Sequence, residues 1–336
     1  MKSIPMNIKA FIILFSAALL LISCAGTTDR PHSKSGLYFD TIISVDIYDP
    51  VSDADRILDE CMDLCSHYQA LFDRKVPTSD IARISSGKAG TVSVDPDTAS
   101  LLTEALKYCR LSEGRFDITI APVSSLWDFH EGSEKIPDPA ALREALSHIG
   151  YENIEVDTKA STVTVKTDGI SLDVGGAAKG YIADRIADHL KECGVGGAII
   201  NMGGDMMLIG HKSDKKLFNI GINDPDNPGG VAARLYVSDK AVATSGIYER
   251  SFISEGRTYH HILDVTTAYP VDTDIESVTV ICDSAAASDC LCTVCTILGA
   301  DGAQKLIEDL PDTEAVFILT DGSMRATSGA GIYLRQ

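Results

Sequence analysis

The chain has 336 residues, of which 45% are hydrophobic and 23% charged, and its formal net charge is −19 at pH 7. This composition is that of an ordinary globular protein of one large or two small domains, and it excludes disordered and collagen-like chains. Nucleic-acid phosphates need Lys and Arg partners, so we expect no nucleic-acid partner for so acidic a protein. Any phosphate-bearing ligand must be held locally.

The N-terminal segment has the features of a targeting signal. Lys2 and Lys9 accompany an apolar run over residues 10–22, which is short for a transmembrane helix but typical of a signal peptide. The run ends in Leu-Ile-Ser-Cys at residues 21–24, which resembles the lipobox of bacterial lipoproteins. We expect cleavage before Cys24 and lipidation of its thiol. The alternative is an ordinary cleaved signal with an accidental cysteine.

This signal divides the chain into three expected segments. Residues 1–23 form the signal peptide, residues 24–36 a polar tether, and residues 37–336 one catalytic unit. The expected product is a domain held by lipid at a membrane of the bacterial cell envelope, the inner or cytoplasmic membrane, facing the periplasm or the exterior. No later stretch of the sequence is apolar for long enough to suggest another membrane span.

Hydrophobic periodicity predicts the elements in chain order. An amphipathic helix over residues 57–72 follows a first strand and carries Cys61 and Cys65 on its apolar stripe, where cysteine is expected as a small core residue. The other predicted helices cover residues 97–111, 178–193 and 285–298, and the predicted strands cover residues 41–48, 161–166, 170–174, 198–201, 218–222, 234–237, 276–282 and 314–319. Because helices and strands do not alternate strictly, we expect an α+β fold with mixed sheets.

Three further cysteines lie close together in the last predicted helix: Cys290, Cys292 and Cys295. Residues two apart on a helix point to different sides, so Cys290 and Cys292 are poorly placed to share one metal ion. We therefore expect buried thiols here rather than a metal cluster. An envelope protein also permits disulfides, which remain the alternative.

Two glycine-containing turns are candidates for ligand contact. The segment Asp-Val-Gly-Gly-Ala-Ala-Lys-Gly-Tyr at residues 173–181 opens a predicted helix, whose free amides and positive end suit an anion. The segment Asn-Met-Gly-Gly-Asp at residues 201–205 follows an apolar strand, where paired glycines let the backbone approach a ligand. The alternative for the first segment is a structural turn, and for the second a bulge.

Asp289 and Thr293 are metal-ligand candidates in the last predicted helix. An aspartate in an apolar helix is costly unless it is paired, and the i, i+4 spacing places the Thr293 hydroxyl on the same face. Two hard oxygen donors suit Mg²⁺, which also takes phosphate oxygens as ligands. The alternative is that Asp289 caps the helix.

Residues 243–264 gather a hydroxyl pair, an arginine, two histidines and an aspartate. His260 and His261 are adjacent in an extended segment, so they face opposite sides and at most one of them lines a given site. The single tryptophan, Trp127, stands near Phe129 and is expected in the core.

Taken in order, these segments resemble the ApbE family, the FAD:protein FMN transferases. The resemblance spans residues 37–320 and rests on ordered motifs that begin at Gly114 (Gly-x-Phe-Asp-x-Thr), Asp173 (Asp-x-Gly-Gly-x-Ala-Lys-Gly-Tyr), Asn201 (Asn-x-Gly-Gly-Asp), Thr244 (Thr-Ser-Gly-x-Tyr-Glu-Arg), His260 (His-His-Ile-x-Asp) and Asp289 (Asp-x-x-x-Thr). It implies a two-lobed α+β fold with FAD in the cleft between the lobes. It also implies Mg²⁺-dependent cleavage of FAD, transfer of FMN to a Thr or Ser of a partner protein, and release of AMP.

The resemblance further implies an acceptor flavoprotein subunit that carries a Ser/Thr-Gly-Ala-Ser/Thr motif. Other functions stay open. Some spirochaetal members act chiefly as FAD pyrophosphatases that give free FMN and AMP. Outside the enzyme class, the chain would be a non-catalytic flavin-binding lipoprotein or a cysteine-based redox lipoprotein.

Residue by residue, the resemblance implies that His261 accepts the proton of the incoming hydroxyl. It implies three Mg²⁺ ligands: Ala178 through its carbonyl, Asp289 and Thr293. The residues implied to contact the flavin are Phe39, Val76, Asp117, Ile118, Thr119, Gly175, Lys179, Tyr181, Ile262 and Leu263.

The chain departs from the family pattern near two of these groups. Val265 and Ala268 stand where the family usually has proline and glycine, which alters a turn near the candidate base. Phe39-Asp40-Thr41 stands where the family usually has Met-Gly-Thr. Both departures concern flavin contacts more than the metal site.

Overall fold

A sheet of eight strands organises the structure, a computed structural model that describes residues 30–129, 135–227 and 229–334. The strand order is β1-β2-β6-β7-β10-β13-β14-β15, and the pairings between these strands are antiparallel. The strands are β1 (His32–Tyr38), β2 (Thr41–Ile47), β6 (Gly197–Met202), β7 (Met206–Gly210), β10 (Ala241–Gly246), β13 (Ile275–Cys282), β14 (Glu314–Leu319) and β15 (Met324–Ala326).

Three smaller antiparallel sheets surround this large one. Their strands are β3 (Gly90–Ser93), β5 (Thr162–Val165) and β4 (Ile154–Asp157) in the first, β8 (Phe218–Asn223) and β9 (Val231–Val237) in the second, and β11 (Ser251–Ser254) and β12 (Arg257–His260) in the third. The β8–β9 hairpin covers one face of the large sheet and a long helix covers the other, so β13 is buried along most of its length. The predicted α+β class is confirmed, but the sheets, expected to be mixed, are antiparallel in all pairings between the described strands.

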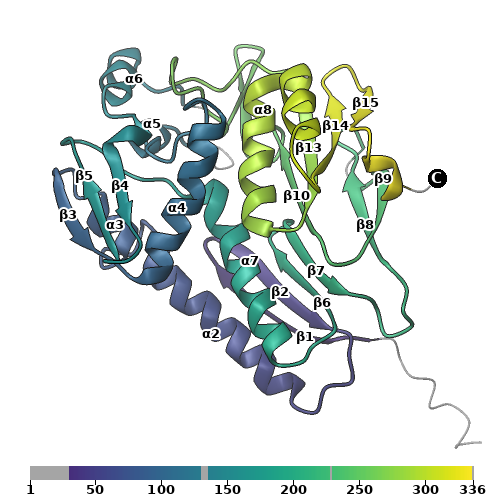
Figure 1. Ribbon diagram of the computed structural model, residues 1–336. Helices are drawn as coiled ribbons and strands as arrows, with labels where there is room; N and C mark the ends of the chain where they lie inside the picture. Colours follow the sequence, from purple (N-terminus) through teal and green to yellow (C-terminus); the bar gives the residue numbers. More distant parts are fainter. Residues whose placement is uncertain (1–29, 130–134, 228, 335–336) are drawn as a thin grey trace, which may run out of the picture. The chain divides into compact units, whose positions relative to one another are not determined.

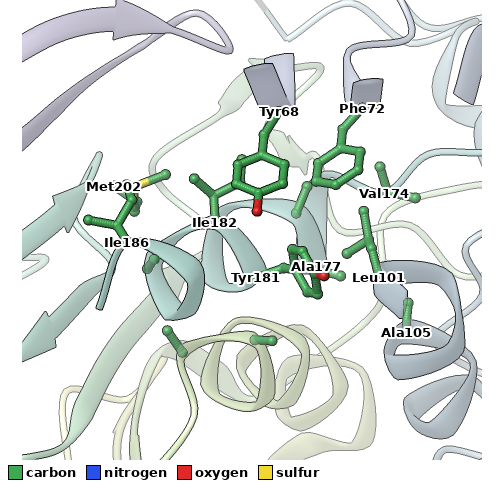
Figure 2. Packing of buried hydrophobic residues seen from close by; sticks show 14 of the residues in the cluster. Tyr68, Phe72, Leu101, Ala105, Val174, Ala177, Tyr181, Ile182, Ile186 and Met202 are labelled. Carbon is green, nitrogen blue, oxygen red and sulfur yellow. The ribbon is translucent and has the colours of Figure 1, made fainter. Parts of the chain in front are cut away.

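The helices lie mainly between the large sheet and the three-stranded sheet (Figure 1). They are α2 (Ala54–Phe72), α3 (Asp80–Ile84), α4 (Pro96–Leu111), α5 (Ala121–Ser124), α6 (Pro139–Leu146), α7 (Gly175–Glu192) and α8 (Ala285–Glu308), with 3₁₀ turns η1 (Tyr151–Asn153) and η2 (Ala330–Ile332). Figure 2 shows the core where α2, α4 and α7 meet: Tyr68 and Phe72 of α2 point towards Tyr181 and Ile182 of α7. This core fixes α7, whose first turn carries the glycine motif.

A close contact between α7 and α8 sets the position of the candidate metal ligands. A Cβ atom on Gly180 would lie 2.1 Å from the carbonyl oxygen of Ala285, so only glycine permits this approach. Asp184 of α7 accepts hydrogen bonds from the Ser284 hydroxyl and from the Ala285 and Ala286 amides. These bonds satisfy free amides at the start of α8, one helical turn before Asp289.

Most predicted elements are confirmed, with three differences. The residues 170–174, predicted as a strand, are irregular, because the amides of Leu172 and Asp173 bond to Ser85 Oγ and the Ile118 carbonyl rather than to a neighbouring strand. Strand β1 begins at His32, inside the segment expected to be a tether. Helix α8 continues to Glu308 through a kink at Gly299 instead of ending near residue 298.

The eight cysteines that the structure describes are free thiols. Seven are buried, which agrees with the expectation of core cysteines, and Cys193 is partly exposed. By length and composition α8 could cross a membrane. However, it packs against α7, β10 and β13, and it therefore serves here as a core helix. The predicted signal, including Cys24, lies outside the described residues.

Candidate functional site

A cavity of about 680 Å³ brings together most of the residues singled out in the sequence. The segment that leads into α5 contributes to its lining. Strand β10 of the large sheet and helix α8, which covers that sheet, contribute as well. The predicted residues that line it are Phe39, Asp117, Gly175, Ala178, Lys179, His261, Ile262, Leu263, Asp289 and Thr293.

Four predicted flavin contacts do not line this cavity: Val76, Ile118, Thr119 and Tyr181. Tyr181 belongs to the core (Figure 2), where its hydroxyl donates to Asp97 Oδ1 at 2.8 Å and its ring packs edge-on against Tyr68. Ile118 is 1% exposed. Val76 lies in the turn after α2, next to two basic residues that do reach the cavity.

Thr119 is fully buried and supports Asp117 from behind the cavity wall. Its amide and hydroxyl donate to Asp117 Oδ1 at 2.7 and 2.6 Å, while the Tyr151 amide donates to Asp117 Oδ2 at 2.9 Å. Burial raises the pKa of Asp117, and these hydrogen bonds oppose the rise. With both carboxylate oxygens engaged, Asp117 holds the loop at the cavity wall.

Lys179 is the central charge of the cavity. Its Nζ atom lies 2.8 Å from Asp205 Oδ2 and 3.2 Å from Asp289 Oδ1. Burial disfavours the ammonium, but the two carboxylates more than offset this and raise the pKa of Lys179. Burial, with Asp205 nearby, raises the pKa of Asp289 to about 6, although Lys179 and the Gly180 amide, 3.1 Å from Asp289 Oδ2, oppose the rise.

Asp289 and Thr293 present two oxygen donors to the cavity from one side of α8. Gly176 faces them: a Cβ atom there would lie 3.3 Å from the Thr293 hydroxyl, so a side chain would crowd this group. Ala178 lines the same space from the first turn of α7. A carboxylate and a hydroxyl are ligands that Mg²⁺ accepts, so this set of donors fits the metal that the sequence predicted.

The two adjacent histidines lie in different surroundings, as the extended backbone predicted. His260 is 4% exposed, and its Nε2 atom lies 3.2 Å from the Val271 carbonyl oxygen. His261 lines the cavity, and its Nδ1 atom is buried without a hydrogen-bond partner in the described part of the chain. Burial, and then the charge of Arg250, lower the pKa of His261 to about 4. Its imidazole is therefore neutral at pH 7 and free to accept a proton.

The turn beside His261 explains one departure from the family pattern. Ala268 has φ 64°, a left-handed conformation that glycine adopts more readily. Its carbonyl oxygen accepts a hydrogen bond from Trp127 Nε1 at 2.9 Å. The Trp127 ring is 6% exposed and stacks on Tyr259 at 5.8 Å, so the expected core role is confirmed, although its edge also reaches the cavity.

Several cavity residues were not assigned a role from the sequence. They include three cationic side chains, Arg74, Arg115 and Arg250, and the carboxyl group of Glu249, whose pKa is raised by desolvation and by Asp205. Asp205 itself appeared only as the end of a glycine motif. Arg74 could have been noticed from the sequence, because it forms a basic pair with Lys75 just after a predicted helix in a very acidic chain. Nothing in the local sequence pairs Asp205 with Lys179.

Comparison with known proteins gives one consistent family. The model of the ApbE family matches residues 39–317. A protein of Treponema pallidum named FAD:protein FMN transferase is 31% identical, covering 91% of this chain and 90% of that protein. The crystal structure of the ApbE protein from Thermotoga maritima superposes with a TM-score of 0.83 at 29% identity, covering 91% of this chain and all of the other. The flavin transferase ApbE from Vibrio cholerae, at 24% identity and a TM-score of 0.81, shares the fold and covers 91% of this chain and 99% of its own.

Proposed function

The chain belongs to the ApbE family, and on that basis we propose that it is a flavin transferase that takes FAD as its substrate. In the proposed reaction a Thr or Ser hydroxyl of a partner protein attacks the FMN phosphorus, the pyrophosphate bond breaks, and AMP leaves. The observation that carries the proposal is the placement of His261. Its imidazole, whose Nδ1 atom has no hydrogen-bond partner among the described residues, lines the same cavity as Lys179 and the Asp289–Thr293 oxygen pair.

The cavity has the size and the charges that a dinucleotide needs. Its volume of about 680 Å³ is in the usual range for ligand sites. Arg74, Arg115 and Lys179 supply positive charge for the pyrophosphate in a chain of net charge −19. Ile262 and Leu263 offer an apolar wall for the flavin ring.

We propose that Asp289 and Thr293, with the backbone carbonyl of Ala178, hold Mg²⁺. When bound there, the ion neutralises pyrophosphate charge and stabilises the leaving AMP. Lys179 would add positive charge at the same place, because its ammonium contacts the Asp289 carboxylate. Gly176 leaves the Thr293 hydroxyl open to the cavity.

His261 is proposed to take the proton from the incoming hydroxyl. The neutral imidazole is the form that accepts a proton, and the low pKa of His261 keeps it neutral across the physiological range. An anionic substrate in the cavity would raise this pKa and so strengthen the base. Arg250 fixes the backbone here, because its carbonyl accepts the His261 amide at 3.1 Å.

The test is to incubate the full chain with FAD, Mg²⁺ and a peptide that carries a Ser/Thr-Gly-Ala-Ser/Thr motif. We expect a peptide that has gained the mass of FMN less one water, together with an equal amount of AMP. Free FMN and AMP without an adduct would instead identify a pyrophosphatase. FAD recovered intact from a stable complex would identify a carrier.

The Leu-Ile-Ser-Cys segment supports a second part of the proposal. Lipidation at Cys24 would hold the enzyme at a membrane of the bacterial cell envelope, with the acceptor protein exposed on the same side. Strand β1 begins only at His32, which leaves a short polar connection after Cys24.

A further inference from the structure

A second group of metal-binding side chains lies away from the flavin cavity, between α2 and the end of α7. His189 stands in the last turn of α7, Cys193 is the residue that caps its C-terminus, and Glu60 projects from the middle of α2. None of the three lines the cavity. At a rise of about 1.5 Å per helical residue, His189 lies roughly 15 Å along α7 from Lys179.

The three ligand atoms converge on one point. His189 Nε2 lies 3.1 Å from Glu60 Oε2 and 3.8 Å from Cys193 Sγ, and the three atoms lie within 4.8 Å of one another. Ligands at about 2.0–2.3 Å in a tetrahedral arrangement are separated by about 3.5 Å. Small rotations of these side chains would therefore close them around one ion.

Charge and exposure also favour a metal ion at this point. Arg56 holds the other oxygen of Glu60, with Nη1 to Oε1 at 2.5 Å, and so orients the carboxylate with Oε2 towards His189. The side chains of His189 and Glu60 are 25% and 37% exposed, which leaves a path for an ion and space for water. Among the eight described cysteines Cys193 alone is not buried.

We propose that Glu60, His189 and Cys193 form a Zn²⁺ site that links α2 to the C-terminal end of α7. A thiolate, an imidazole and a carboxylate are all ligands that Zn²⁺ accepts, and a water molecule would complete four-coordination. On binding, the Cys193 thiol gives its proton to solvent and the sulfur bonds to the metal. The link would stabilise the packing of α2 on α7, the helix whose first turn lines the flavin cavity.

An ordinary ion pair between Glu60 and His189 is the competing explanation. It accounts for the 3.1 Å contact, but it gives the Cys193 sulfur no role. The contribution of this sulfur to metal binding therefore distinguishes the two explanations.

The experiment is a titration of the full chain with Co²⁺, a spectroscopic substitute for Zn²⁺, and with Zn²⁺ itself, both in excess Mg²⁺. The proposal expects one ion per chain, a thiolate-to-cobalt charge-transfer band, and a melting temperature that Zn²⁺ raises. Cys193→Ser should abolish the band, and His189→Asn should weaken Zn²⁺ binding by at least about 10²-fold, because loss of a direct ligand exceeds the usual cost of losing a supporting group.

Two variants serve as controls. His148 and Glu144 form another histidine–carboxylate pair, at 3.8 Å and without a thiol, so His148→Asn should leave the titration unchanged. Asp289→Ala should also leave the cobalt band intact, because that residue belongs to the other site. The proposal would be overturned if Zn²⁺ binding survived both Cys193→Ser and His189→Asn, or if it disappeared in Asp289→Ala. The absence of a thiolate band in the parent chain would also overturn it.

Discussion

Lys179 Nζ lies 2.8 Å from Asp205 Oδ2, in a cavity where the ammonium also contacts Asp289. The pair joins the first turn of α7 to the turn between β6 and β7. It neutralises two carboxylates that would otherwise face each other across a largely buried space. Lys179 therefore stabilises the arrangement of the two carboxylates and would supply positive charge to an anion that enters the cavity.

Replacing Lys179 by methionine should destabilise the protein when Mg²⁺ is absent. Breaking a buried ion pair by removing one partner typically costs about 3–5 kcal/mol, and because the Lys179 side chain is 29% exposed we expect the lower end of that range. Mg²⁺ should restore part of the loss in the variant, since an ion that binds only the folded state stabilises it. Urea unfolding with and without Mg²⁺ measures both effects.

Lys75→Met is the matched control for this prediction. Lys75 also pairs with an aspartate, Asp40, but the two side chains are 63% and 67% exposed. Exposed pairs contribute about 0–1 kcal/mol, so this variant should unfold almost as the parent does. Equal stability of the Lys179→Met variant and the parent, at all Mg²⁺ concentrations, would show that the buried pair has no such role.

Asp289→Ala should abolish Mg²⁺-dependent cleavage of FAD. The ion would lose its charged ligand, whereas Thr293→Val removes only a neutral hydroxyl and should be less damaging. Asp301→Ala offers a control on the same helix, because this aspartate is 95% exposed and pairs with Arg325. AMP release measured against Mg²⁺ concentration gives the result; parental turnover by Asp289→Ala at limiting Mg²⁺ would place the metal elsewhere.

Cys24→Ala should release the protein from the membrane fraction without changing its chemistry. The expectation rests on the Leu-Ile-Ser-Cys segment, in which this cysteine is the proposed site of lipidation. Fractionation of cells tests the release from the membrane, and an assay of AMP release from FAD tests whether the chemistry is unchanged. A variant that stays with the membrane would contradict lipid anchoring at this residue.

Local spacing predicted the parts of the fold and the site that depend on one element. Alternation identified β2, and the i, i+4 interval placed Asp289 beside Thr293. It did not identify the irregular segment over residues 170–174, because an extended chain has the same alternation whether its amides bond to a strand or to loop groups.

Contacts between distant segments could not be read in this way. Tyr181 follows the glycine motif directly, yet its ring packs against Tyr68 of α2 rather than facing the cavity. Likewise, Asp205 and Lys179 meet only because β6 and α7 pack together. Family resemblance implied that both Lys179 and Tyr181 contact the flavin. Tertiary packing places Lys179 in the cavity wall and Tyr181 in the core.

The low pKa of His261 should make the protein less stable in mild acid. In the unfolded chain this imidazole takes up a proton near pH 6.5, whereas in the folded state it does so only near pH 4. The unfolded state therefore binds more protons between these values, and stability falls as the pH falls through this window. The difference between these two pKa values corresponds to a change of at most about 3 kcal/mol in the free energy of unfolding.

The His261→Gln variant isolates this contribution. Carboxyl groups with raised pKa values, such as Asp117 and Asp184, act in the opposite direction, so the parent curve alone is not diagnostic. As the pH falls from 7.5 to 4.5, the free energy of unfolding of the parent should decrease relative to that of the variant. A difference that stays constant over this range would show that His261 titrates normally in the folded chain.

His261→Ala should retain FAD affinity but lose FMN transfer by about 10²–10⁴-fold, the usual contribution of a general base. In the proposed mode of binding, FAD is held by the cationic side chains and the first turn of α7, which this substitution leaves in place. His260→Ala is the control, because His260 faces the Val271 carbonyl instead of the cavity; it should cost stability more than transfer. Flavin fluorescence follows binding, and the mass of an acceptor peptide follows transfer. Parental transfer by His261→Ala would move the search for the proton acceptor to Asp205, which also lines the cavity.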